Sequence, residues 1–227
     1  INRMYPGSPI LNLLWQVKIA GPINVPTLQK SLQTIVDRHD ALRASFLEEN
    51  GVLVQRIVAR LPVDCSFTCL SGVSSDEKLI QLKTLRRAMG LAPFDLETGP
   101  LFRFHLIQLD HDEYLLLTAF HHLVFDGTSR PVFFDELVAA YSGESLAPLP
   151  MQYGEYAVWQ QQMLETGSWI QHEVYWKKAL AGEFSVLELP TDHLRPKAKS
   201  GSAAVCTHTL PNELKASLKS LGKKHHS

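Results

Sequence analysis

Several features that mark specialised classes of protein are missing from this sequence. No apolar run among the 227 residues is long enough to span a membrane, and nothing at the start resembles a signal peptide. The 22 Lys and Arg residues and the 23 Asp and Glu residues are interspersed, for a net charge of −1. Such a chain offers no electrostatic footprint for DNA, RNA or an anionic lipid surface. We therefore expect a soluble globular protein that binds neither nucleic acid nor membrane.

Cysteine is also scarce. The three residues Cys65, Cys69 and Cys206 are an odd number and lack the paired spacing of a zinc site. Reduced thiols of this kind favour a cytoplasmic protein. The sequence therefore predicts packing cysteines, no disulfide framework and no metal site.

One stretch carries most of the candidate chemistry. Residues 114–120 form a charge-free, aromatic-rich run that predicts a strand buried on both faces. His121 and His122 end this run, and Asp126-Gly127 follows. Thr128-Ser129-Arg130-Pro131 then predicts the start of a helix, which should run to about Tyr141. The two histidines should lie at a strand-to-helix junction, where unpaired backbone N–H groups favour an anion or a developing oxyanion.

The chemistry of this junction depends on which way each side chain points. Adjacent strand residues face opposite sides, so one of His121 and His122 should face a cleft and the other the interior. The exposed imidazole is a candidate general base. Asp126 could orient it or pair with an arginine, and Gly127 would allow a backbone conformation closed to other residues and a close approach of substrate. The alternative is two hydrogen-bonded core histidines followed by an ordinary Asp-Gly turn.

The remaining pattern alternates strands and helices, which predicts an α/β fold. Alternating apolar residues predict strands near 13–19 and 101–107, in addition to the buried run at 114–120, and Glu49-Asn50-Gly51 predicts a hairpin turn. Helical spacing and capping residues predict helices from about Pro26, Ser74, Pro131, Tyr153, Trp169 and Pro211. A linker is expected at 187–196 and a short strand at 203–209. The chain begins at Ile1 and ends inside a helical pattern, as expected of a fragment of a longer protein.

Several of these stretches resemble one family in order along the chain. Residues 121–127, HHLVFDG, fit the HHxxxDG signature of the condensation domains of nonribosomal peptide synthetases. Residues 38–46, RHDALRASF, resemble the family's RHExLRxxF segment, with Asp40 in place of Glu. Residues 93–103 are similar to its PFDLxxGPLxR segment, and the stretches 153–160, 175–176 and 189–196 resemble later signatures. The resemblance therefore spans nearly the whole chain.

The resemblance implies a chloramphenicol acetyltransferase-like fold, with a mixed β-sheet flanked by helices. Complete domains of this family have two such lobes with the active site between them. Residues 1–185 would be the N-terminal lobe, and residues 186–227 a linker and the truncated start of the C-terminal lobe. The truncation leads us to expect that this chain alone lacks activity.

The resemblance also implies a reaction and roles for residues. The complete domain would be an acyltransferase that joins a carrier-bound acyl or peptidyl thioester to a carrier-bound amine. The substrates would arrive on phosphopantetheine arms of donor and acceptor carrier domains, beside other synthetase domains, with no cofactor bound to the domain itself. His122 would be the catalytic histidine, which removes a proton from the amine or positions it. His121 would be structural.

Three further residues complete the implied site. Asp126 would hold the loop through an arginine, for which Arg43 is the candidate. Gly127 would keep the tunnel open, and Arg103 would be a second structural support.

Two other functions remain open at this point. A free-standing acyltransferase of the same superfamily would use a soluble thioester such as coenzyme A. A non-catalytic lobe would serve as a docking or gating module. The ordered later motifs argue against the first, and the intact HHxxxDG sequence argues against the second.

Overall fold

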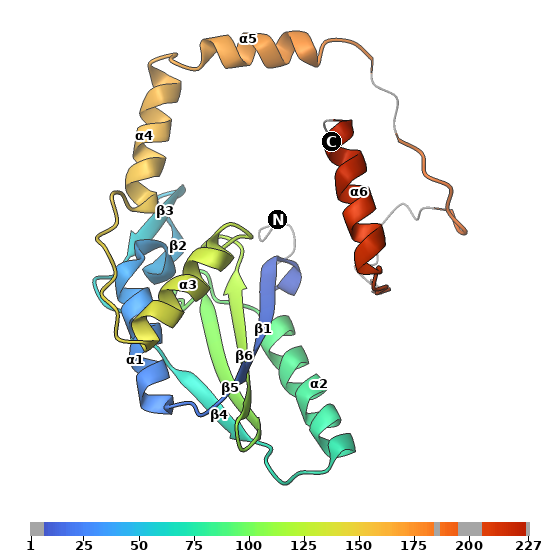
Figure 1. Cartoon of the computed structure of the whole chain (residues 1–227). Coiled ribbons are helices and arrows are strands. Elements are labelled where there is room, and N and C mark those ends of the chain that lie inside the picture. Colours follow the sequence, from blue (N-terminus) through green and yellow to red (C-terminus); the bar gives the residue numbers. More distant parts are fainter. Residues whose placement is uncertain (1–6, 184–186, 195–205, 226–227) are drawn as a thin grey trace. The chain divides into compact units, whose positions relative to one another are not determined.

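The chain is described by a computed structural model, which places residues 7–183, 187–194 and 206–225. It divides into two compact units, residues 1–175 and 176–227. The first unit holds all the strands found in the described ranges (Figure 1). Its elements are η1 (Pro9–Leu11), β1 (Asn12–Ala20), α1 (Val25–Arg38), η2 (Asp40–Arg43), β2 (Ala44–Glu49), β3 (Val52–Ile57), β4 (Cys65–Cys69), α2 (Ser75–Leu91), β5 (Phe102–Asp110), β6 (Glu113–His121), α3 (Ser129–Tyr141) and α4 (Tyr153–Glu165).

The main sheet has the strand order β1-β6-β5-β4. β6 runs antiparallel to both β1 and β5, whereas β4 runs parallel to β5, so the predicted mixed sheet is confirmed. Strands β2 and β3 form the predicted hairpin as a separate two-stranded sheet. Strand β4 was not predicted, although its sequence Cys-Ser-Phe-Thr-Cys alternates apolar and polar residues over five positions, which is the signal that could have found it.

Strand β6 is buried on both faces, as its charge-free sequence predicted. Leu116 and Phe120 point toward α1 and α3, while Leu115, Leu117 and Ala119 point toward α2. Figure 1 shows α1 and α3 on one side of the sheet and α2 on the other. Because side chains alternate along a strand, this arrangement sends His121 to the α2 face.

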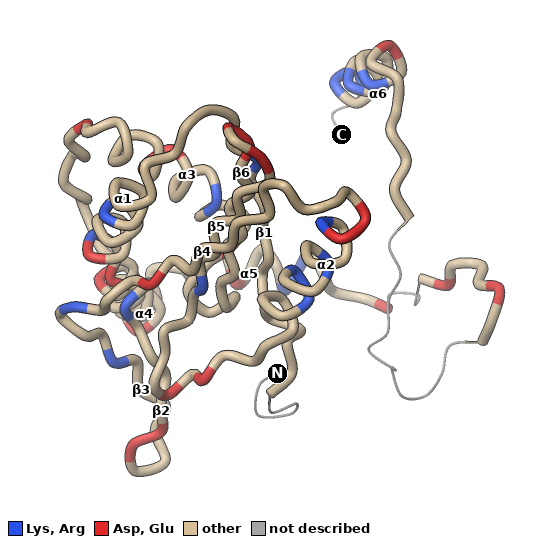
Figure 2. The backbone as a smooth tube through the Cα atoms, turned by 90° about the horizontal axis from the view of Figure 1, so that it is seen from below, with Lys and Arg blue, Asp and Glu red and all other residues tan. Residues whose placement is uncertain are grey.

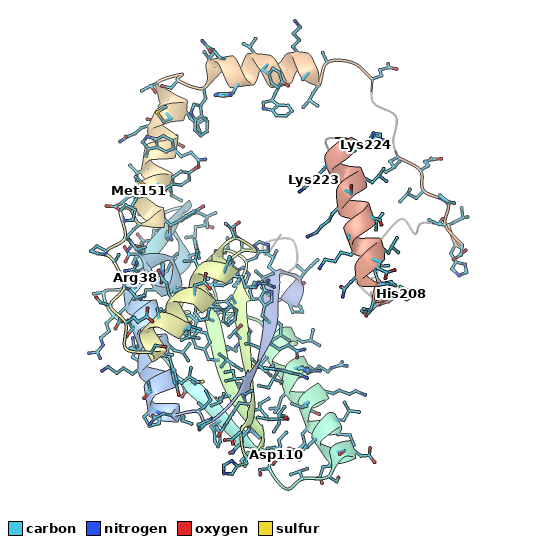
Figure 3. All side chains as sticks on the ribbon, viewed as in Figure 1. Arg38, Asp110, Met151, His208, Lys223 and Lys224 are labelled. Carbon is cyan, nitrogen blue, oxygen red and sulfur yellow. The ribbon has the colours of Figure 1, made fainter. Side chains whose placement is uncertain are left out.

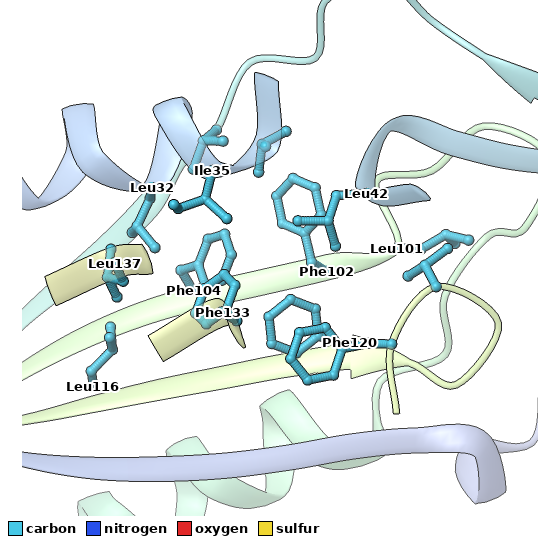
Figure 4. Close-up of a cluster of buried hydrophobic side chains, with 14 of the residues drawn as sticks. Leu32, Ile35, Leu42, Leu101, Phe102, Phe104, Leu116, Phe120, Phe133 and Leu137 are labelled. Atoms are coloured by element: carbon cyan, nitrogen blue, oxygen red, sulfur yellow. The ribbon is translucent and has the colours of Figure 1, made fainter. Parts of the chain in front are cut away.

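An aromatic cluster fills the layer between the sheet and α3 (Figure 4). The ring centroid of Phe120 lies 5.7 Å from that of Phe104 and 5.2 Å from that of Phe133, both with edge-to-face geometry. Helix α1 closes the same layer with four buried apolar residues at helical spacing, Leu28, Leu32, Ile35 and Val36. The end of β6 is therefore anchored in the largest apolar core of the protein.

Capping residues fix the helices that flank the sheet. The Asn24 side chain accepts a hydrogen bond from the backbone N–H of Thr27 at 2.9 Å, and Pro26 lies in the first turn of α1. Ser74 caps α2 at Glu77, as the sequence predicted. Helix α2 continues through Gly90 to Leu91, and an added Cβ at Gly90 would lie 3.3 Å from Leu14 Cδ2. Glycine at this position lets α2 pack closely on β1.

The second unit contains one helix that lies wholly within it, α6 (Asn212–Lys224), among its described residues. Helix α5 (Ile170–Ala179) crosses the division between the two units. Residues 187–194 are irregular, as expected of the predicted linker. The strand predicted at 203–209 is wrong for residues 206–209, which are irregular, and residues 203–205 lie outside the described ranges. The predicted lobe boundary at residues 185 and 186 stays a prediction.

Charged side chains of both signs are scattered over the first unit rather than gathered on one element (Figure 2). Among the residues that the structure describes, no helix is long and apolar enough to cross a membrane.

Candidate active site

The histidine motif lies where the sequence predicted, between the end of β6 and the start of α3. Two backbone hydrogen bonds hold the first two residues of the motif. The N–H of His121 donates to the carbonyl of Leu101 at 2.9 Å, and the N–H of His122 donates to the carbonyl of Leu11 at 2.8 Å. Both neighbouring segments therefore hold the backbone of the motif in place.

His121 is buried, with 2% of its surface exposed. Its Nδ1 accepts a hydrogen bond from the backbone N–H of Leu123 at 3.2 Å, so the neutral ring carries its proton on Nε2. Burial, and to a lesser extent the neighbouring His122, lowers the pKa of His121 below its ordinary value. The edge-to-face contact with Phe94, at a centroid distance of 6.1 Å, completes its surroundings. His121 therefore stays neutral near pH 7, which suits a structural residue.

His122 is exposed and faces a pocket of about 420 Å³. The split between a buried and an exposed histidine confirms the predicted alternation. The polar lining residues are His39, His122, Asp126, Thr128, Ser129 and Tyr153, and the apolar ones are Ala41, Leu42, Leu123, Val124, Phe125, Val132 and Phe133. The pocket thus places an accessible imidazole beside an apolar wall.

Asp126 caps the helix that follows the motif. Its Oδ1 accepts hydrogen bonds from the backbone N–H of Ser129 at 2.7 Å and from the Ser129 hydroxyl at 2.8 Å. The Ser129 oxygen in turn accepts from the N–H of Asp126 at 3.2 Å. Thr128, one of the cap residues suggested by the sequence, forms no such bond. Asp126 therefore closes the loop locally.

The prediction that Arg43 pairs with Asp126 is wrong. Arg43 forms an ion pair with Asp40 and donates to the carbonyls of Asp37 at 2.7 Å and Val58 at 3.0 Å. It therefore supports the turn between α1 and β2, the segment that supplies His39, Ala41 and Leu42 to the pocket wall. The guanidinium of Arg43 is thus bound by a carboxylate three residues away in sequence and by nearby carbonyls, rather than by the distant Asp126.

The backbone prediction for Gly127 is also wrong. Positive φ angles occur at eight other described glycines but not at Gly127, and an added Cβ there would meet open space. No backbone strain requires glycine at this position. The open space leaves room for a substrate to approach the main chain, so its role in the site stays a prediction.

Arg103 supports the loop that covers His121. Its guanidinium donates to the carbonyls of Ala92 at 3.0 Å and Pro93 at 2.6 Å, and it lies 3.7 Å from the centroid of the Phe94 ring. Partial burial lowers the pKa of Arg103, which nevertheless remains charged. Because Phe94 contacts His121, Arg103 fixes one wall around the buried histidine, in keeping with the predicted structural support.

A cluster of three charged or titratable residues, of which His39 lines the pocket, was missed by sequence reasoning. The carboxylate of Glu136 on α3 accepts from Arg38 Nε at 3.0 Å and from His39 Nε2 at 2.6 Å. All three side chains are largely buried, with exposed fractions of 17%, 23% and 15% for Arg38, His39 and Glu136. Figure 3 labels Arg38 at the end of α1. The sequence offered no signal for this cluster, because Glu136 lies 97 residues from His39.

The thiols and the acidic residues provide no second centre. The three cysteines are free, and burial raises the pKa of the Cys65 thiol to about 11, so it stays protonated near neutral pH. Within residues 7–183, 187–194 and 206–225, no group of three or more His, Cys, Asp or Glu side chains is arranged to hold a metal ion. The pocket with His122 is therefore the site to which the candidate chemistry belongs.

We expect Asp126→Ala to lower the free energy of unfolding by about 1 kcal/mol, the usual cost of losing a helix cap. Hydrogen bonds from Ser129, its side chain first, lower the pKa of Asp126 in the folded state. Its stabilisation is therefore complete above the unfolded-state pKa and is lost as pH falls through the folded-state pKa. Urea unfolding from pH 3 to 7 should show a difference between wild type and variant that disappears in acid. A difference that persists unchanged in acid would contradict the cap.

The fold and the site together define a mixed α/β domain whose sheet presents one buried and one accessible histidine beside a pocket. The particular family follows from a direct match: the family model described as the condensation domain matches residues 1–227. The chain belongs to the condensation-domain family.

Curated relatives are large synthases or parts of them. The chain is 36% identical to surfactin synthase subunit 2 of Bacillus subtilis (strain 168), over 88% of this chain and 5% of that protein. It is 35% identical to tyrocidine synthase 2 of Brevibacillus parabrevis, over 90% of this chain and 6% of that protein. The chain thus spans only a small part of the relatives that it matches.

Solved structures share the fold. The starter condensation domain of rhizomide synthetase RzmA superposes with a TM-score of 0.69 at 24% identity, over 79% of this chain and 44% of that chain. The SgcC5 protein from Streptomyces globisporus superposes with a TM-score of 0.67 at 26% identity, over 82% of this chain and 43% of that chain. The predicted fold class is therefore confirmed, and the chain corresponds to less than half of each of these proteins.

Proposed function

We propose that this chain is the histidine-bearing, N-terminal lobe of a condensation domain that forms an amide bond within a nonribosomal peptide synthetase. The donor is an acyl or peptidyl thioester on one carrier domain, and the acceptor is an aminoacyl group on another. Family membership over the whole chain supports this assignment, as does the coverage of less than half of the solved domains.

One observation carries the proposal: His122 is exposed at the mouth of a pocket whose other wall is apolar, while its neighbour His121 is buried and held neutral. An accessible imidazole can take a proton from a nitrogen as that nitrogen attacks a carbonyl carbon. The apolar part of the lining would strengthen an interaction with the charged intermediate once bound substrate displaces water from the pocket.

The reaction follows from the chemistry of the groups. The nitrogen lone pair attacks the thioester carbonyl carbon, and the carbonyl electron pair moves to oxygen. His122 takes a proton from the attacking nitrogen. The carbonyl then re-forms, the carbon–sulfur bond breaks, and the proton passes to the departing thiolate.

No cofactor is needed by this scheme, since both substrates bring their own phosphopantetheine arms. The partners are then two carrier domains and neighbouring synthetase domains, in keeping with relatives that are large synthases or parts of them. The three free cysteines support a reducing, cytoplasmic location.

The test uses the full-length protein, with cognate donor and acceptor loaded on its carrier domains, and intact mass of the acceptor carrier as readout. We expect a mass gain equal to the acyl donor. The same donor supplied as a coenzyme A thioester distinguishes a free-standing acyltransferase, which would form product without a donor carrier. Absence of product from both donors, in a folded protein with both carriers loaded, would favour a docking or gating lobe and overturn the proposal.

A further inference from the structure

His39 lines the same pocket as His122, and it forms a cluster with Arg38 and Glu136. His39 follows α1 and lines the pocket, while Glu136 comes from α3. The reaction scheme proposed above assigns no role to this cluster. Its burial and its short contacts set it apart from an ordinary surface ion pair.

The contacts orient the ring of His39. Glu136 also accepts a hydrogen bond from Arg38 Nε at 3.0 Å. In the tautomer that donates the 2.6 Å bond from His39 Nε2 to Glu136 Oε2, the lone pair of a neutral ring lies on Nδ1. A carboxylate thus orients His39 and leaves one ring nitrogen able to accept a proton.

The backbone around His39 is held as firmly as its ring. The Gln152 side chain donates to the carbonyl of Arg38 at 2.9 Å and accepts from the N–H of Asp40 at 3.1 Å. These two bonds grip the residues before and after His39 at the start of α4. The imidazole therefore has a defined position on the pocket wall before any substrate binds, as a catalytic group requires.

Amide formation requires a second proton acceptor. The α-amino group has a pKa of about 7.7–8.0, so the acceptor is mostly an ammonium ion near pH 7. An ammonium nitrogen must lose one proton before it can attack and a second one after the carbon–nitrogen bond has formed. Only one of these protons is taken up by the departing thiolate. The other must pass to a different acceptor, which is either water or a side chain of the site.

We propose that His39, supported by Glu136, accepts the first proton from the acceptor ammonium. His39 Nδ1 takes that proton, the neutral amine attacks the thioester, and His122 carries the second proton from nitrogen to sulfur. His39 then releases its proton to water, so that thioester and ammonium become amide, thiol and one free proton. This role rests on the proposed function and adds a catalytic residue to it.

The matching variant is His39→Gln, because the glutamine amide can still donate to Glu136 but cannot accept a proton. We expect its single-turnover rate at pH 7 to fall by about six- to elevenfold, because only about 9–17% of an amine with a pKa of about 7.7–8.0 is neutral at that pH. The deficit should shrink as pH rises to about 9, where the acceptor amine is already neutral. The deficit should also shrink to less than about threefold with an aminoacyl acceptor whose amine pKa is lowered by fluorine on its β-carbon.

The control variant is Arg38→Met, which removes the other partner of Glu136 and leaves His39 in place. Because His39 keeps its proton-accepting nitrogen, the deficit of this variant at pH 7 should be smaller than that of His39→Gln. The pH dependence assigned to His39 is separated in this way from the other titratable and charged groups near it, namely Glu136, Arg38, Asp40, His122, Asp126 and Tyr153. Glu136→Gln provides a second measurement, and it should show the same pH-dependent deficit as His39→Gln.

Two results would overturn the inference while leaving the proposed function intact. One is a His39→Gln enzyme as fast as wild type. The other is a deficit equal for ordinary and fluorinated acceptors at every pH, which would make His39 a structural clamp between α1 and α3. If His39→Gln fails to fold by circular dichroism, the Glu136→Gln profile decides in the same way. Failure of the wild-type protein to form amide would instead count against the proposed function.

Discussion

His122→Ala should reduce amide formation by about 100- to 10,000-fold, the range for removing a general acid–base group. His122 is the exposed histidine of the motif and lines the pocket, while its backbone is held by a hydrogen bond that the substitution leaves in place. Removing the imidazole therefore takes away the proton acceptor without disturbing the core. The measurement is the single-turnover rate of amide formation on loaded carrier domains of the full-length protein.

A matched control is His111→Ala. His111 lies in the turn between β5 and β6, and 93% of its side chain is exposed. The His111→Ala substitution should leave the rate of amide formation unchanged. A His122→Ala protein that is folded and makes product at the wild-type rate would exclude His122 as the catalytic group.

Phe120→Ala should lower the free energy of unfolding by about 3–5 kcal/mol, as expected for a large aromatic residue deleted from a packed core. Phe120 is fully buried, and its ring stacks on Phe125 at 3.9 Å and meets Phe104 and Phe133 edge to face. Typical domains are stable by only about 5–15 kcal/mol, so this one change removes a large fraction of the total. Urea denaturation followed by tryptophan fluorescence measures it.

The same variant should also weaken the site, because Phe120 directly precedes His121 and Phe125 lies within the motif loop. Phe67→Ala is the comparison: Phe67 is 46% exposed on the edge strand β4, and its loss should cost less than about 1 kcal/mol. Equal destabilisation by the two changes would show that the aromatic cluster does not anchor the motif.

The parts of the site that sequence predicted are those set by local periodicity. The run from Tyr114 to Phe120 has no charge, which favoured a strand buried on both faces, and it became β6. Because side chains alternate along a strand, His121 and His122 had to face opposite sides. The helix start after Asp126 followed from cap chemistry, although the cap is Asp126 itself rather than Thr128.

The errors concerned residues whose partners or backbone angles depend on the folded surroundings. Motif position suggested that Arg43 pairs with Asp126, but the guanidinium found Asp40 and nearby carbonyls within reach. Gly127 suggested a special backbone conformation, yet its φ is ordinary. A residue type shows what a position allows, whereas the neighbours decide what it does.

By itself, the sequence determined the α/β class, the strand and helix that flank the motif, and the order of the family signatures, since each depends on residues close together along the chain. Only the tertiary structure decided that β4 joins the sheet in parallel, that Arg103 and Phe94 wall in His121, and that Glu136 meets His39 across 97 residues. The physical reason is that a hydrogen bond or an ion pair forms wherever folding brings the groups within about 3 Å. The amino-acid pattern within either segment therefore does not indicate which distant residue it will contact.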